Sequence, residues 1–215
     1  HEYGDGTIDP AGYRHLESFA LDGALPVWRY AADDVVVERR VWMPHGEQAT
    51  WLTYRLVRGA RPVRIEVSPL VVDRSFHSLA TAREPRVTNV TGSEAGDDAG
   101  PMIAILWRDD GPVVRLAATV GAVEPAAVWY RDFLHREERA RGLDERSDAF
   151  VPGTFRLELA PEVLVGIRLD VVSSEDEGGP DPIDHVDLDA EASLEAARAR
   201  QADLIDRAAA IDADP

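Results

Sequence analysis

The 215-residue chain carries 40 acidic residues against 23 basic ones, and its formal net charge of -17 disfavours nucleic acid and anionic membranes as partners, because both attract clustered positive charge. The absence of Cys excludes disulfides, thiolate nucleophiles and Cys-based metal sites, and is compatible with the cytoplasm. No apolar run reaches the length of a membrane span and the first residues show no signal-peptide pattern, so we expect a cytoplasmic protein without a membrane partner.

Short strand-like runs recur along most of the chain, and turn residues such as Asp22-Gly23 separate nearly all of them. Many short strands at regular spacing predict a mainly β fold, an antiparallel β-sandwich. The expected strands cover residues 16–21, 27–31, 35–43, 50–57, 63–72, 86–92, 102–107, 113–120, 123–130, 154–159 and 163–171.

The most informative run is residues 35–57, where two alternating segments flank the turn Pro44-His45-Gly46. A period of two puts successive side chains on opposite faces of a strand. The first segment thus sets Val35, Val37, Arg39 and Val41 against Val36, Glu38, Arg40 and Trp42. The pattern predicts a β-hairpin that brings Trp42, Trp51 and Tyr54 close together.

Two segments have a helical composition. Residues 131–146 are rich in helix formers with opposite charges three or four apart, and Gly142 is a plausible stop, so we expect a short helix near 131–142. Residues 190–211 predict a second helix that leaves the sheet, with Asp187 and Asp189 as possible caps. Its apolar side consists of Leu194, Ala197, Leu204, Ile205 and Ala208.

These elements predict three parts. Residues 1–172 would form the sandwich domain, residues 173–189 an acidic loop or linker rich in Gly and Pro, and residues 190–211 the terminal helix.

No catalytic constellation is recognisable. The chain has no Gly-x-Ser-x-Gly elbow and no Gly-rich phosphate loop, and its six His residues are scattered. Glu137 and Glu138 are neighbours on the expected first helix and cannot flank one bond. The acidic cluster Asp181, Asp184, His185, Asp187 and Asp189 lacks the spacing of a calcium loop. We predict no catalytic residue, no metal and no cofactor in this chain.

Aromatic residues on or beside strands are the better candidates, because a ring face can stack on a sugar while nearby polar groups take its hydroxyls. His residues at strand ends can join them. Core packing for the tryptophans, and local hydrogen bonding for the histidines, are the competing interpretations. A mutarotase-like enzyme acting on a free sugar is a third, and would need a His and a carboxylate to converge on one concave face, with His45, His77 and Glu38 as the candidates. The predicted carbohydrate-binding residues are Trp28, Trp42, His45, Trp51, His77, Trp129 and Tyr130.

Five segments in order carry a family resemblance: GTIDPAGYRHLESF at 6–19, LPVWRY at 25–30, VVERRVWMPHGEQATWLTYRL at 36–56, SPLVVDRSFHS at 68–78 and WYRDFLHREERARGLDERSDAFVPGTF at 129–155. Through them the chain resembles the N-terminal domain of prokaryotic glycogen debranching enzymes of the amylo-α-1,6-glucosidase type. The resemblance implies a β-supersandwich, antiparallel throughout, like galactose mutarotase and the N-terminal domain of glucoamylase.

The same resemblance implies a function. Such enzymes hydrolyse α-1,6 branch points in glycogen or limit dextrin, with catalytic carboxylates in an (α/α)6 helical barrel. The N-terminal domain is expected to bind the α-glucan and to buttress that barrel, so this chain alone would be inactive. Residues 190–211 would be the linker helix. The family domain begins upstream of the residues that match Gly6, so the sandwich here would lack its first strands. The alternative role is purely structural, with no sugar binding.

Overall fold

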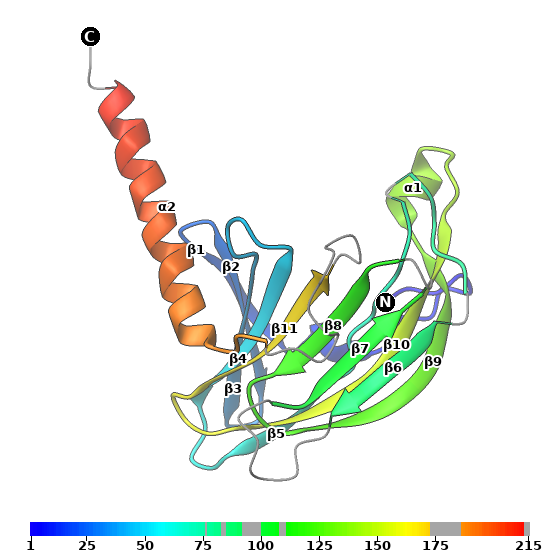
Figure 1. The fold of residues 1–215 in the computed structure, drawn as a ribbon, viewed down its shortest axis with the longest axis horizontal. Helices are drawn as coiled ribbons and strands as arrows, with labels where there is room; N and C mark the ends of the chain where they lie inside the picture. Colours follow the sequence, from blue (N-terminus) through cyan, green and yellow to red (C-terminus); the bar gives the residue numbers. More distant parts are fainter. Residues whose placement is uncertain (76, 83–84, 92–99, 108–110, 173–185, 213–215) are drawn as a thin grey trace.

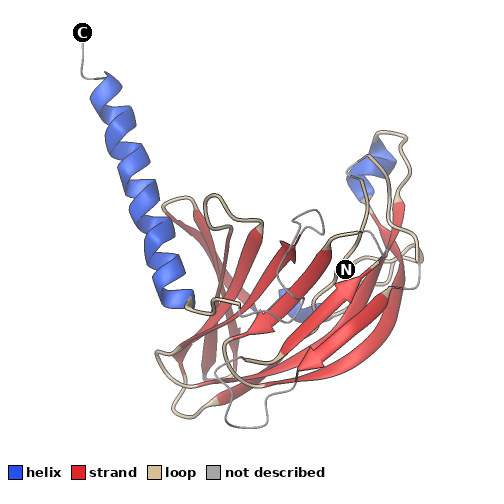
Figure 2. Cartoon of the chain, viewed as in Figure 1, coloured by secondary structure: helices blue, strands red, loops and turns tan. Residues whose placement is uncertain are grey.

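The computed structural model describes residues 1–215 except 76, 83–84, 92–99, 108–110, 173–185 and 213–215. Within the described residues, eleven strands form two sheets whose neighbouring strands are all antiparallel (Figure 1). This architecture confirms the predicted mainly antiparallel β-sandwich, and Figure 2 shows how far strands dominate the body of the molecule.

The large sheet has eight strands in the order β1-β2-β3-β4-β11-β8-β7-β6. Their bounds are β1 Leu16–Asp22, β2 Leu25–Ala32, β3 Val35–Trp42, β4 Ala49–Arg58, β11 Leu164–Val172, β8 Val113–Ala118, β7 Met102–Leu106 and β6 Arg86–Thr91. The small sheet has the order β5-β10-β9, with β5 Val63–Val67, β10 Arg146–Leu159 and β9 Ala122–Leu134.

The main core lies between the small sheet and the β4-β11-β8-β7 half of the large sheet. Phe155 and Leu157 of β10 pack there with Ile103, Ile105 and Leu116, and all five side chains are essentially inaccessible. The strand alternation explains this core, because every second residue of each strand turns toward the facing sheet. We call this face of the large sheet its inner face.

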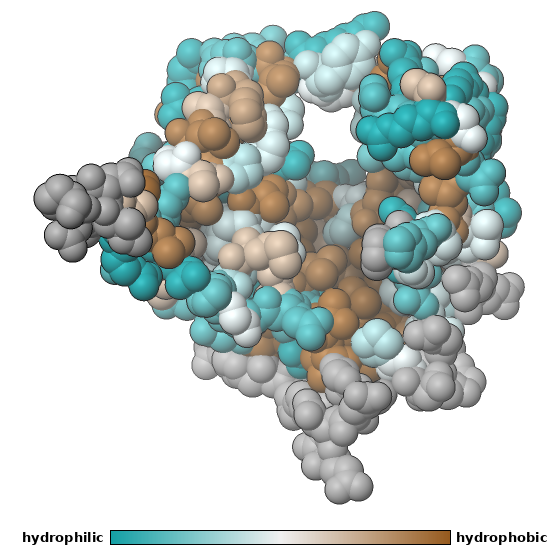
Figure 3. Space-filling view, turned by 90° about the horizontal axis from the view of Figure 1, so that it is seen from above, coloured by the Kyte–Doolittle hydropathy of each residue, from teal (hydrophilic) through white to brown (hydrophobic). Residues whose placement is uncertain are grey.

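Strands β1 to β3 continue the large sheet past the part that carries the main core. Leu16, Phe19 and Leu21 of the edge strand β1 are 44%, 56% and 61% exposed. Figure 3 shows, from above, a hollow with apolar side chains on its floor. The uncovered inner face of these strands therefore gives the molecule a concave surface.

The helix expected near 131–142 is shorter than predicted. Only α1, Arg136–Ala140, is helical, because β9 continues to Leu134 and β10 starts at Arg146. These strand ends pair with each other. The backbone of residues 2–4 forms hydrogen bonds with the other edge of β9, which faces away from β10. Gly142 ends the helix as predicted: its φ of 72° is left-handed, which suits a residue without a Cβ.

Two strand limits also differ from expectation. β10 begins well before the expected residue 154, and Pro152 is tolerated inside it because the register with β9 shifts between Val151 and Gly153. β5 ends at Val67, and beyond it Val71 makes only an isolated bridge to Phe150.

The C-terminal helix α2 spans Ala190–Asp212, close to the predicted 190–211. Asp189 caps it as predicted, since its Oδ1 accepts a 2.9 Å hydrogen bond from the backbone of Ala192. Leu194 is buried against the sheet, but Leu204 and Ile205 are 47% and 58% exposed. The predicted apolar side is thus covered only near the start of the helix, and the rest of α2 projects away from the sheet (Figure 1).

Charged groups fill the outer face of the large sheet beside α2. Glu38 accepts hydrogen bonds from Arg29 at 3.0 Å and from Arg40 at 2.8 Å. Asp22 accepts from Arg40 and from Arg198 of α2, both at 2.6 Å. Burial would raise the pKa of Glu38, but the hydrogen bonds from the two Arg residues outweigh it and lower the pKa below its ordinary value of 4.5.

This lowered pKa predicts an acid-sensitive contribution to stability. A carboxylate whose folded pKa is depressed stabilises the fold above its ordinary pKa, and the effect is lost as the pH falls through the folded pKa. We expect Glu38→Gln to cost about 1–3 kcal/mol near neutral pH. The difference in free energy of unfolding between the variant and the unmutated chain should become smaller below pH 4.5. Urea unfolding across a pH series measures it, with the exposed Glu158→Gln as control; a gap that does not change with pH contradicts the assignment.

Candidate functional site

A cavity of about 820 Å³ opens on the concave inner face of β2, β3 and β4. Residues from the amino-terminal segment and from β5 form its other walls. This volume lies within the range of ligand pockets, which are mostly apolar with a few polar groups. The lining residues are His1, Pro10, Gly12, Tyr13, His15, Leu16, Trp28, Tyr30, Ala32, Val35, Val37, Arg39, Tyr54, Val63, Ile65, Glu66 and Val67.

A row of side chains crosses the floor of this cavity from strand to strand and continues beyond its lining to Phe19. Phe19 of β1 pairs with Trp28 of β2, Trp28 with Arg39 of β3, and Arg39 with Tyr54 of β4. Directly opposed residues on one face of a sheet touch, which explains the contacts. The Phe19 and Trp28 ring centroids are 5.4 Å apart, and the Arg39 guanidinium carbon lies 4.7 Å from the Trp28 centroid.

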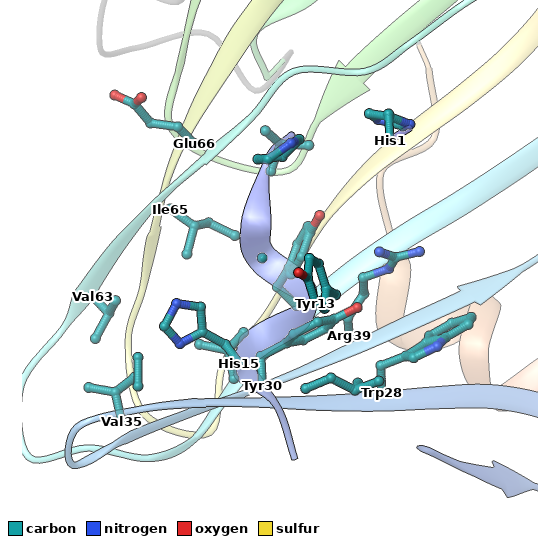
Figure 4. Close-up of a pocket in the computed structure, with 17 residues that line it drawn as sticks. His1, Tyr13, His15, Trp28, Tyr30, Val35, Arg39, Val63, Ile65 and Glu66 are labelled. Carbon is teal, nitrogen blue, oxygen red and sulfur yellow. The ribbon is translucent and has the colours of Figure 1, made fainter. Parts of the chain in front are cut away.

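A short 3-10 helix, η1 (Ala11–His15), brings further rings to the cavity. Tyr13 is 56% exposed, and His15 Nδ1 lies 3.3 Å from the carbonyl oxygen of Ala31 on β2. Figure 4 shows Tyr13 and Tyr30 next to Arg39, with Trp28 beyond it. The cavity therefore offers ring faces and phenol groups together.

The polar groups of the cavity differ in their environments. Burial is the main reason that the pKa of Tyr54 is raised to about 12, so this phenol stays protonated and can donate a hydrogen bond. Glu66 pairs with Arg156 at 3.3 Å, and its carboxylate points away from the Tyr13 and Arg39 side chains in Figure 4. Arg39 contributes the positive charge nearest the aromatic row.

This arrangement can bind a ligand, but its chemistry does not match glycoside hydrolysis. That reaction needs two carboxyl groups flanking one bond. Glu66 is the one carboxylate side chain among the described residues that line the cavity.

Comparison with protein families supplies the decisive observation. Residues 1–165 match the family model described as glycogen debranching enzyme N terminal. The chain belongs to this family. No match was found among curated proteins. Among the described residues, no helix is long and apolar enough to cross a membrane.

The tryptophans that were predicted to bind carbohydrate in this debranching-family domain do not gather at one place. Trp28 lines the cavity, whereas Trp42 and Trp51 lie on the outer face of the sheet beneath α2. Trp42 is 4% exposed, and its Nε1 donates a 3.0 Å hydrogen bond to Ser193 Oγ of α2. Trp51 is 0% exposed and stacks on Trp42 with centroids 6.0 Å apart. The core-packing interpretation describes these two rings.

The remaining predicted residues lie elsewhere. His45 is exposed and borders a second cavity, of about 390 Å³, between the Pro44 turn and α2. His77 is exposed in the segment after Val71. Trp129 packs on Phe150 at 5.3 Å, and Tyr130 is 39% exposed with its ring 6.4 Å from that of Phe133.

The mutarotase-like alternative required a His and a carboxylate on one concave face, with His45, His77 and Glu38 as candidates. Glu38 instead lies on the outer face, and neither His lines the concave cavity. For the acidic cluster, residues 181, 184 and 185 are outside the described part of the chain. Asp189 caps α2, and Asp187 accepts a hydrogen bond from the backbone of Asp189 just before the helix.

Three cavity residues were missed from the sequence: Tyr13, His15 and Arg39. Tyr30 and Tyr54 were among the aromatic candidates on strands, but were left out of the predicted binding set. Arg39 carried a readable signal, because it interrupts the otherwise apolar side Val35, Val37 and Val41 of its strand. A charged residue on an inward strand face suggests a site. Tyr13 carried no comparable signal, and the convergence of the three tyrosines depends on strand register.

Proposed function

We propose that this chain is the non-catalytic glucan-binding and scaffolding module of a glycogen debranching enzyme. The observation that carries the proposal is the aromatic cavity on the concave face of a domain of this family. The ligand is an α-glucan or maltooligosaccharide, and the site of action is the cytoplasm. In the full-length enzyme, an (α/α)6 barrel holds the catalytic carboxylates that hydrolyse the α-1,6 branch points.

The cavity has the chemistry that a sugar requires. Exposed ring faces such as that of Tyr13 suit the apolar face of a pyranose, while the Tyr54 hydroxyl and the Arg39 guanidinium suit its hydroxyl groups. The site is open enough for part of a longer chain to extend beyond it, as the hollow in Figure 3 illustrates.

The scaffolding part of the proposal rests on α2. Its first half is fixed to the sheet by the Trp42–Ser193 hydrogen bond and by the 2.7 Å ion pair between Arg55 and Glu191. Its second half exposes Leu204 and Ile205. A helix anchored in this way can set the position of the barrel relative to the sandwich.

Binding is tested by titrating maltoheptaose against the chain and two cavity variants in a calorimeter. Tyr13→Ala removes an exposed ring and Trp28→Ala the indole of the cavity floor, and each is expected to weaken binding at least about tenfold. Trp129→Phe, away from the cavity, is the matched control and should leave the affinity unchanged. Equal affinities for all four proteins would refute the assignment of this cavity.

Hydrolysis is tested separately. The isolated chain should release no glucose from a limit dextrin, because Glu66 has no second carboxylate beside it among the described residues that line the cavity. Measurable release that persists after removal of trace contaminating glucosidase would contradict the non-catalytic assignment.

The second candidate is a purely structural domain that binds no sugar. The burial of Trp42 and Trp51 under α2 favours it, since these rings already serve packing. An absence of any maltoheptaose binding by a correctly folded chain would select this alternative.

A further inference from the structure

Arg39 differs from the other Arg residues of the large sheet whose Nε is buried without a hydrogen-bond partner among the described residues. Arg55 and Arg168 share that feature but form ion pairs with Glu191 and Glu47, whereas no ion pair within the described part of the chain includes Arg39. On the outer face, by contrast, Arg40 bonds to Glu38 and Arg115 bonds to Asp170, each at 2.8 Å. Arg39 thus faces the cavity without a carboxylate partner among the described residues, although the chain has 40 acidic residues.

The contact of Arg39 with its neighbour in the sheet leaves its N–H donors without hydrogen bonds to the described residues. The guanidinium carbon lies 4.7 Å from the centre of the Trp28 ring, a cation–π contact that uses no N–H donor. Because Nε is buried, the donors left for a ligand are the Nη groups, for which the described residues supply no acceptor. A planar fork of donors matches the two oxygens of a carboxylate or a phosphate.

The other cavity groups do not neutralise this charge. Glu66, on β5, is engaged by Arg156 and points away from Arg39 in Figure 4. Tyr54, the cross-strand partner of Arg39, stays a neutral phenol. An anionic group placed at Arg39 would thus meet one unopposed cation and hydroxyl donors in a partly desolvated site, where charge-assisted hydrogen bonds are strongest.

We propose that the cavity takes a saccharide bearing an anionic group, a phosphate or a carboxylate, which Arg39 binds through its guanidinium fork. This inference rests on the proposed saccharide site, and it adds the charge of the preferred ligand. The aromatic walls hold the sugar ring, and Arg39 selects for the anion.

The test compares four probes on one protein: glucose, glucose 6-phosphate, glucuronate and inorganic phosphate. Affinities are measured by calorimetry for the unmutated chain, Arg39→Gln, Arg39→Lys and Arg64→Gln. Arg64 is an exposed residue of β5 outside the cavity lining, so it controls for the loss of one positive charge. Far-UV circular dichroism and a thermal melt establish that each variant is folded.

We expect glucose 6-phosphate or glucuronate to bind at least about tenfold more tightly than glucose, because hydrogen bonds to charged groups exceed neutral ones by this order. Arg39→Gln should abolish that preference, Arg39→Lys should restore only part of it, and Arg64→Gln should retain it. The probe that binds more tightly, phosphate ester or carboxylate, identifies the source of the anion. Inorganic phosphate alone should bind more weakly than the sugar phosphate.

Two results would overturn the inference: equal affinity for glucose and both anionic sugars, or an anionic preference that survives Arg39→Gln. These failures are separate from failure of the proposed function. Maltoheptaose binding that depends on Tyr13 would persist if only the charge preference were wrong, and it would be missing if the cavity were no saccharide site.

Discussion

Replacing Trp51 with Ala is expected to lower the free energy of unfolding by about 3–5 kcal/mol. The side chain is fully buried between the large sheet and α2, where it stacks on Trp42. Gly166 of β11 makes room for it, since a Cβ there would lie 3.2 Å from the indole. The truncation therefore leaves a large cavity beneath α2. The expected loss of free energy approaches the whole stability of a marginal domain.

Urea unfolding followed by circular dichroism measures this loss, and Trp51→Phe provides an informative comparison. The Trp51 Nε1 is buried and has no acceptor among the described residues. Phe keeps most of the ring and removes this unsatisfied donor, so its cost should stay below about 1.5 kcal/mol. Ile205→Ala, on the exposed part of α2, should change stability by less than about 0.5 kcal/mol. A loss below about 1 kcal/mol for Trp51→Ala would contradict the described packing.

The second large effect is expected at Asp170. Its carboxylate accepts two hydrogen bonds of 2.8 Å from the Nε and Nη2 of Arg115, and both residues are more than nine-tenths buried on the outer face. Asp170→Ala leaves a buried guanidinium without this carboxylate, which typically costs about 3–5 kcal/mol.

A double variant separates the free-energy cost of removing one partner from the net contribution of the Arg115–Asp170 pair to stability. Arg115→Met combined with Asp170→Leu removes both charges and should recover most of the loss in urea unfolding, because a buried pair is often replaceable by apolar residues. Asp203→Ala, which breaks the exposed pair with Arg207, should cost less than about 0.5 kcal/mol. If Asp170→Ala lowers the free energy of unfolding as little as Asp203→Ala does, the result contradicts the buried Arg115–Asp170 pair.

The local signals of the sequence predicted most of the architecture. Strand-like runs separated by turn residues located all eleven strands, and alternation identified the hairpin of β3 and β4, because a strand with two unlike faces alternates. Asp189 and the apolar spacing around Leu194 predicted the start of α2 for an equally local reason. The segment 131–146 was misassigned because its helix formers are overridden by pairing between the ends of β9 and β10.

The candidate site was much less predictable. Trp28 was recognised, but its neighbours Arg39 and Tyr54 come from other strands, and only the pairing register puts them in one row. Trp42, Trp51 and Tyr54 were expected close together: the two indoles do stack, but Tyr54 lies on the opposite face and lines the cavity, so this prediction was wrong for Tyr54. Alternation does not tell which face of the sheet α2 will cover. Whether a ring is exposed depends on what packs over its face of the sheet, which here is α2 on the outer face.

The most direct test of glucan binding at the concave face is to map the bound ligand on the folded chain. Maltoheptaose titrated into isotopically labelled protein should shift the amide resonances of Tyr13, Trp28, Tyr30 and Arg39 saturably, while those of Trp51 and Leu194 beneath α2 stay in place. Shifts confined to the outer face, or no shifts at saturating oligosaccharide, would contradict a glucan-binding role for the cavity.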